Sequence, residues 1–117
     1  MLFILIVKNS KTAEAGGPPN LGLQEAMSDY NRQLVAAGVR VMAKGLYPSS
    51  SGMRVTFLKE GERPVVTEGP FEDVKEMIAG FILIDVKSRE EAVEWALKMP
   101  DPIGNGDGEI ELRQVHE

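Results

Sequence analysis

The residues best suited to chemistry gather in one stretch, residues 65–81, between two apolar runs. In this stretch Glu68 stands directly before Gly69-Pro70, and Lys75 and Glu76 follow within a few residues. A carboxylate can act as a general base, and a nearby lysine can balance its charge or act as an acid. Gly-Pro favours a tight turn, which keeps Glu68 near the segment that carries Lys75. We therefore predict Glu68, Lys75 and Glu76 as catalytic residues that border one cleft.

The same stretch also has a purely structural interpretation. A carboxylate before Gly69-Pro70 can cap the first N–H groups of a short helical segment, which contributes about 1 kcal/mol. Lys75 and Glu76 are adjacent, so on a helix they point in different directions and one of them faces water. Under this interpretation the turn is structural and Glu68 takes no part in catalysis.

Three further residues are predicted to bind a ligand beside this turn. Arg54, on a neighbouring expected strand, offers a guanidinium fork that suits an anion. Tyr30 offers a hydroxyl group, although it also falls on the apolar stripe of the first expected helix. Phe71 belongs to the turn stretch itself. The candidate ligand-binding residues are therefore Arg54, Tyr30 and Phe71.

Other kinds of site lack the residues that they need. The single histidine, His116, is the penultimate residue, and there is no cysteine, so we expect no catalytic triad and no cysteine-rich zinc site. Residues 105–109 alternate oxygen-bearing side chains, but Ile110 stands where an EF-hand loop needs glycine. The glycine-rich residues 16–20 match no nucleotide-binding pattern. The sequence thus predicts no metal and no cofactor.

Length and charge narrow the class of protein. The chain has 117 residues and a net charge of −5, which fits one domain over residues 1–117. Lysine and arginine do not cluster, so a nucleic acid is not an expected partner. The apolar residues 2–7 are too few to span a bilayer and lack the flanks of a signal peptide. We expect a cytoplasmic protein without membrane contacts.

Hydrophobic periodicity predicts the elements that must position these residues. Residues 2–7 are a continuous apolar run, which is typical of a central strand buried on both faces. Residues 11–22 are expected to form a loop. The remaining expected elements are a helix over 23–37, strands over 39–46 and 53–58 that pair as a hairpin, a short extended piece at 65–66, a strand over 81–86, a helix that starts at 88–91 and ends before 100, and a strand at 110–112.

This order predicts an α+β, ferredoxin-like βαββαβ subunit with two helices on one face of an antiparallel sheet. The other face of an apolar central strand also needs cover. A second copy of the chain is the simplest cover, so we expect a two-fold symmetric homodimer with a cleft in each subunit.

Motifs along almost the whole chain resemble those of the DGPF proteins of the YCII-related family. The matching residues are Tyr30, 37–39, 45–48, 52–55, 67–76, 79–81 and 88–96. The resemblance implies a dimeric α+β barrel of ferredoxin-like subunits. Relatives in the wider group carry a His and Asp pair with a suspected catalytic role, and many DGPF genes lie beside extracytoplasmic-function sigma factors. This chain differs in having Glu68 at the first motif position and its only histidine at His116.

Several functions remain open on this basis. The concentration of charged residues around the Glu-Gly-Pro-Phe turn favours a cofactor-free enzyme or a protein that binds a small polar metabolite. The alternatives are a regulatory partner of an extracytoplasmic-function sigma factor and a purely structural dimeric module. The resemblance suggests the sigma factor as a partner, and a homodimer is expected in every case.

Overall fold

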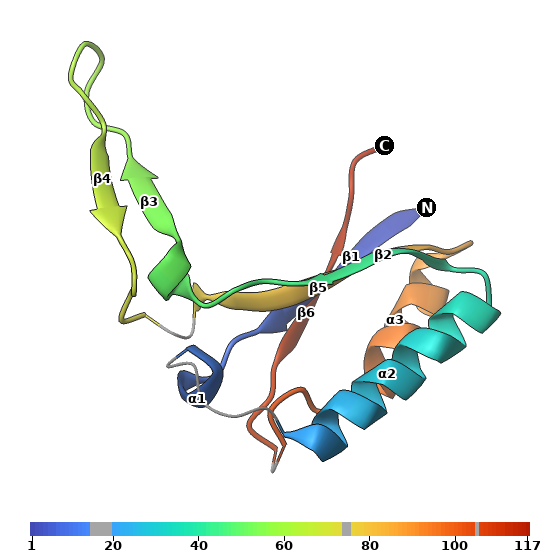
Figure 1. Cartoon of the computed structure of the whole chain (residues 1–117). Helices are drawn as coiled ribbons and strands as arrows, with labels where there is room; N and C mark the ends of the chain where they lie inside the picture. The colour runs from blue at the N-terminus through green and yellow to red at the C-terminus, as the bar shows by residue number, and fades with distance from the viewer. Residues whose placement is uncertain (15–19, 74–75, 105) are drawn as a thin grey trace.

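A computed structural model describes residues 1–14, 20–73, 76–104 and 106–117. The protein is an α+β fold in which two long helices cover one face of an antiparallel sheet (Figure 1). The elements in chain order are β1 (Leu2–Lys8), α1 (Lys11–Glu14), α2 (Leu21–Ala36), β2 (Arg40–Gly45), the 3-10 helix η1 (Ser49–Ser51), β3 (Met53–Thr56), β4 (Val65–Glu68), β5 (Ile78–Asp85), α3 (Arg89–Lys98) and β6 (Ile110–Gln114).

The main sheet has the strand order β2-β5-β1-β6, with antiparallel neighbours throughout. The apolar strand β1 lies inside the sheet beside β5, as the sequence predicts. Together with α2 and α3 this order is that of a ferredoxin-like subunit, so the predicted fold class is confirmed.

The predicted hairpin between residues 39–46 and 53–58 is wrong. β2 pairs with β5, whereas β3 pairs with β4 in a separate two-stranded sheet. Alternating sequence identifies both segments as strands but does not select their partners. We call residues 53–68 the arm, because this hairpin stands clear of the main sheet in Figure 1.

The core lies between the helices and one face of the sheet. Because side chains alternate between the two faces of a strand, β1 presents Phe3 and Leu5 to the helices, and β5 presents Ile82 and Ile84. α2 contributes Leu34, which is fully buried. One continuous core therefore fixes both helices against the two inner strands.

The opposite face of the sheet, which we call the open face, is also apolar. It carries Ile4 and Ile6 of β1, Leu83 of β5 and Met42 of β2, which pairs with Leu83. No helix of the described part of the chain covers this face in Figure 1. Because β1 and β5 are apolar on both faces, the side chains that point away from the helices leave apolar surface outside the core.

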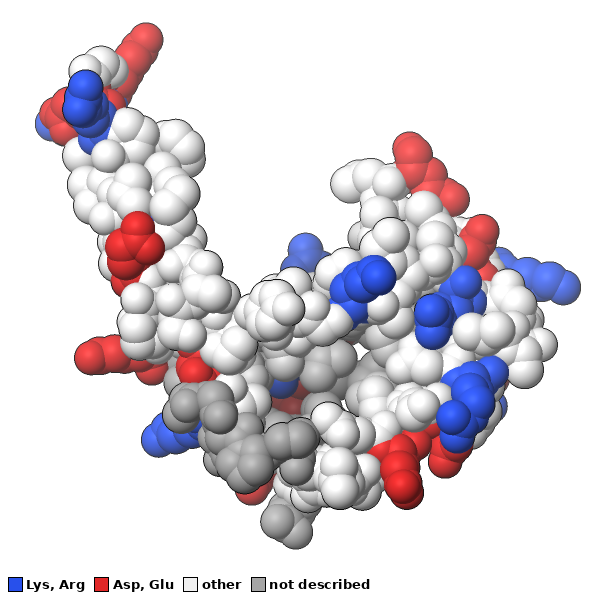
Figure 2. Space-filling model, viewed as in Figure 1, with Lys and Arg blue, Asp and Glu red and all other residues white. Residues whose placement is uncertain are grey.

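The arm exposes apolar side chains on both of its faces, since every residue of β3 and β4 is exposed. Phe57 is 78% exposed and Val66 is 54% exposed. In Figure 2 the middle of the arm is almost uncharged, while charged groups gather near its tip. Contiguous exposed apolar side chains of this kind often mark interaction surfaces.

The expectation of a loop over residues 11–22 is wrong at both ends. Lys11–Glu14 form one helical turn, in which Ser10 Oγ accepts from Ala13 N at 3.0 Å. The second helix already begins at Leu21, where Asn20 caps it by accepting from Leu23 N at 3.1 Å. Residues 15–19 lie outside the described part of the chain.

None of the helices that the structure describes combines the length and apolar character needed to cross a bilayer.

Two paired glycines allow β2 and β5 to approach closely. Gly80 faces Gly45 across the sheet, and a Cβ on Gly80 would lie 2.7 Å from the carbonyl oxygen of Lys44. A Cβ on Gly45 would meet only the oxygen of Ala79, at 3.9 Å. Position 80 therefore requires glycine, because a Cβ there would clash with the backbone of β2. Position 45 has room for a methyl group.

We expect Gly80→Ala to lower the free energy of unfolding by about 1–3 kcal/mol, because the added methyl group forces β2 away from β5. Gly45→Ala is the matched control and should change it by no more than about 0.5 kcal/mol. Urea unfolding of the two variants checks the difference. Equal stability of Gly80→Ala and the wild type would contradict the close contact.

Candidate functional site

The Glu-Gly-Pro-Phe turn lies at the foot of the arm, directly after β4, and Gly69 and Pro70 are joined by a cis peptide bond. The Gly69 N–H donates to the carbonyl of Gly52 at 3.0 Å. A Cβ on Gly69 would overlap the carbonyl of Ser49. The turn is therefore packed tightly against η1, and only glycine fits at this position.

A buried carboxylate, Glu14, holds the turn to the body of the protein. Glu14 is 8% exposed, and its Oε1 accepts from the backbone N–H of Ser49 at 2.9 Å and from Ser49 Oγ. Its Oε2 accepts from Asn9 Nδ2 at 2.8 Å. Ser49 Oγ in turn accepts from the Phe71 N–H at 2.9 Å. This network joins α1, η1 and the turn, and it satisfies a carboxylate that would be costly to bury alone.

Neither Glu14 nor Ser49 was identified from the sequence. A glutamate in a polar segment usually faces water, and Ser49 is 35 residues away from it. One local signal was available, since Ser10 three residues before Ala13 is typical of a helix N-cap. That signal predicts the turn of α1, but it does not show which residue Glu14 contacts.

Arg54 and Phe71, both predicted to bind a ligand, lie together beside this network. The Arg54 guanidinium carbon is 4.0 Å from the centre of the Phe71 ring, and Arg54 Nη2 is 3.0 Å from Asp73 Oδ2. The hydrogen bond from Arg54 holds the pKa of the Asp73 carboxyl below its usual value. The Arg54 side chain remains 43% exposed. The structure thus presents an oriented guanidinium at the surface of the turn.

Glu68 does not share the face of Arg54. In the arm Glu68 pairs with Met53 and Arg54 pairs with Thr67, so alternation places Glu68 and Arg54 on opposite faces. Glu68 is exposed. The carboxylate that contacts Arg54 is that of Asp73, a residue the sequence analysis did not select. A catalytic role for Glu68 stays a prediction.

The structure adds little about the other two predicted catalytic residues, Lys75 and Glu76. Glu76 is exposed, and its backbone N–H donates to the carbonyl of Asp73 at 3.0 Å. Lys75 lies outside the described residues. The predicted pairing of Lys75 with Glu68 therefore also stays a prediction.

Tyr30 lies in the core, away from the Arg54 and Phe71 pair. It is 2% exposed, and its hydroxyl donates to the Trp95 carbonyl at 2.6 Å. Its ring meets that of Trp95 edge to face, with the centres 6.1 Å apart. Burial raises the pKa of Tyr30 to about 12. These contacts give Tyr30 a packing role between α2 and α3, while its predicted part in ligand binding remains without structural support.

Removing the Ser49 hydroxyl should loosen the turn. We expect Ser49→Ala to lower the free energy of unfolding by about 1–3 kcal/mol, because the Phe71 N–H loses its acceptor and Glu14 loses a donor. The exposed neighbour Ser50 supplies the control, and Ser50→Ala should stay within about 0.5 kcal/mol of the wild type. Urea unfolding measures both, and equal effects would show that the network contributes nothing to stability.

Comparison with known proteins agrees with the motif pattern. The chain matches the family described as YCII-related domain over residues 1–117. An uncharacterized protein of Rhizobium meliloti (strain 1021) is 33% identical over 70 residues, which cover 60% of this chain and 55% of that protein. The match thus spans about half the length of this relative. Because the family match covers every residue, the chain belongs to the YCII-related domain family.

Proposed function

We propose that the protein is a homodimer that binds a small polar metabolite at the Glu-Gly-Pro-Phe turn and acts on it without a cofactor. The observation that supports this proposal is the orientation of Arg54. Its guanidinium is stacked on Phe71 and bonded to Asp73, while the Arg54 side chain is still 43% exposed. A cation held in this way loses little conformational freedom when a ligand binds.

Arginine suits a carboxylate or phosphate ligand because its planar group carries five N–H donors. Asp73 contacts Nη2, which leaves the guanidinium able to take a second acceptor. The turn that carries Phe71 is fixed by Ser49 and Glu14. A ligand at Arg54 would therefore meet a rigid surface, which favours specific binding.

Glu68 supplies the chemical step in this proposal. Only Gly69 and Pro70 separate it from Phe71 in the chain. Because Glu68 lies on the face of the arm opposite to Arg54, the proposal requires a ligand that extends around the edge of the arm to reach both residues. A placed carboxylate that transfers a proton typically contributes about 10²–10⁴-fold to a rate. If Glu68 contributes nothing, the same site describes a binding protein.

The homodimer is proposed from apolar surface that one chain leaves uncovered. The open face of the sheet carries Ile4, Ile6 and Leu83, and the arm exposes Phe57 and Val66. Two-fold association would let each arm cover apolar surface of the other subunit, since such interfaces are self-complementary. The apolar character of these surfaces favours a stable dimer over a transient contact.

A charge in the arm should break this dimer. We expect the wild type to sediment as a dimer at micromolar concentration and Phe57→Glu to shift toward monomer, because burying an unpaired carboxylate is costly. Leu97→Glu is the matched control, since Leu97 is 82% exposed on α3. It should leave the dimer intact. Analytical ultracentrifugation measures the oligomeric state of all three proteins. A monomeric wild type would overturn the proposal.

The ligand site is tested with a thermal-shift screen of polar metabolites. A ligand that binds only the folded state stabilises it by about 2.7 kcal/mol at one hundred times its Kd. We expect Arg54→Gln to abolish the shifts of carboxylate and phosphate compounds, whereas Arg63→Gln, in the loop of the arm, should keep them.

The Glu68→Gln variant distinguishes a catalytic role of the turn from a role in binding alone. It should retain the shift and lose turnover of the compound found in the screen, because the amide cannot accept the proton. Compounds whose shift is unaffected by Arg54→Gln bind elsewhere, and this outcome would remove the turn as the ligand site.

A further inference from the structure

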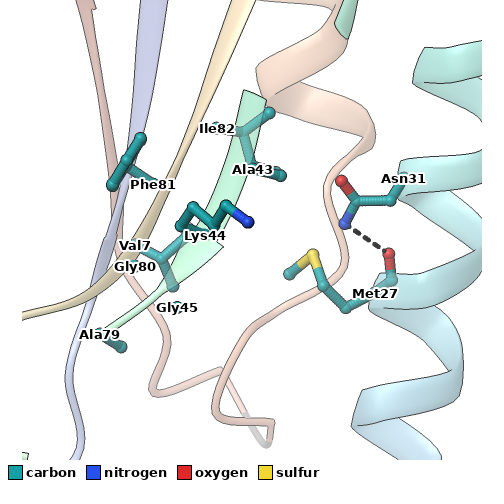
Figure 3. A pocket seen from close by; sticks show the side chains of 10 residues that line it. All are labelled: Val7, Met27, Asn31, Ala43, Lys44, Gly45, Ala79, Gly80, Phe81 and Ile82. Carbon is teal, nitrogen blue, oxygen red and sulfur yellow. Dashed lines mark hydrogen bonds between the residues drawn. The ribbon is translucent and has the colours of Figure 1, made fainter. Parts of the chain in front are cut away.

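A pocket of about 280 Å³ lies between α2 and the strands β2 and β5 (Figure 3). Its apolar walls are formed by Met27 on the helix and by Val7, Ala43 and Ile82 on the sheet. Small-molecule sites usually have about 300–1,000 Å³. The volume therefore suits a small ligand.

The sheet itself creates this hollow. Gly80 pairs with Val7 on one side and with Gly45 on the other, so over β2, β5 and β1 this row carries a single side chain. The next row along the sheet, Leu5–Ile82–Ala43, has a side chain at every position. The space beneath α2 thus stays empty where the two glycines meet.

One side of the pocket is polar and positively charged. Lys44 and Asn31 both line it. Lys44 leaves the edge strand β2 on the face of Met42, and in Figure 3 its side chain runs across the edge of the strand, so that Nζ lies on the side of Asn31 and Met27. Asn31 Nδ2 donates to the Met27 carbonyl at 3.0 Å, and Asn31 Oδ1 faces Arg40 Nη1 at 3.5 Å. Within the described parts of the chain, Lys44 forms no ion pair with a carboxylate. Its charge is available to a ligand.

We propose that this pocket binds a small amphipathic carboxylate, with its apolar body against Met27, Ala43 and Ile82 and its carboxylate on Lys44. An apolar wall favours the hydrocarbon part, and the ammonium group forms a charge-assisted hydrogen bond with the anionic end. Ser49, Arg54 and Phe71 do not line the pocket. The site is therefore separate from the proposed site at the turn and does not depend on it.

Hexanoate is the probe, and hexanol and hexylamine are its controls. In ¹⁵N–¹H spectra of the wild type we expect saturable shifts at the amides of Gly45, Ala79 and Gly80 with hexanoate. Hexanol should bind at least about tenfold more weakly, because it lacks the charge that the lysine recognises. Hexylamine should not bind.

Two variants locate the ligand. Lys44→Gln should raise the Kd for hexanoate at least about tenfold, while Lys59→Gln, in the loop of the arm, leaves it unchanged. Gly45→Val should abolish binding, because a Cβ at this position has room and the added branches occupy the pocket. Circular dichroism confirms that the variant is folded, and Gly45→Ala gives a milder version of the same change.

Three results would overturn the proposal. They are hexanoate binding that survives in folded Gly45→Val, equal affinity for hexanoate and hexylamine, and the absence of saturable shifts at the pocket amides. Arg54→Gln should not alter hexanoate binding. Loss of the metabolite shifts at the turn with hexanoate binding retained would therefore separate failure of one site from failure of the other.

Discussion

The structure depends on two inner strands that are apolar on both faces, while the helices in the described part of the chain cover only one face. β1 and β5 bury Phe3, Leu5 and Ile84 against α2 and α3, and this core holds the subunit together. The opposite side chains of the same strands leave an apolar open face. The exposed arm then adds further apolar surface. This uncovered apolar surface is what supports the proposed association with a second copy, because the hydrophobic effect that forms the core would also favour burying it.

The buried carboxylate of Glu14 connects this core to the candidate site. It is bonded to Asn9 at the end of β1 and to Ser49 beside the turn, so the position of Phe71 is set from the sheet through two side chains. Phe71 in turn orients Arg54. The exposed guanidinium is therefore supported by a chain of buried or half-buried contacts, which is the arrangement that precise ligand binding requires.

The two candidate ligand sites arise from opposite causes. At the turn, polar side chains are brought together and satisfied by one another. Beneath α2, the pair Gly45 and Gly80 removes side chains from the sheet, and the helix cannot fill the space that they leave. A hollow with apolar walls that opens beside Lys44 and Asn31 has the features of a small-molecule site, which is why we propose a second ligand there.

The sequence by itself determined most element types and the ferredoxin-like class, because apolar periodicity and helix caps are local properties, and its motifs resembled those of the family. The central place of β1 and the Ser88 cap of α3, which accepts from Glu91 N at 3.2 Å, were both predictable. Only the tertiary structure decided that β3 pairs with β4, that Asp73 and not Glu68 contacts Arg54, and that Glu14 is buried. These outcomes depend on contacts between residues far apart in the chain or on the register of a strand pair. Local pattern does not specify either one, because a strand shows the same alternation with any partner.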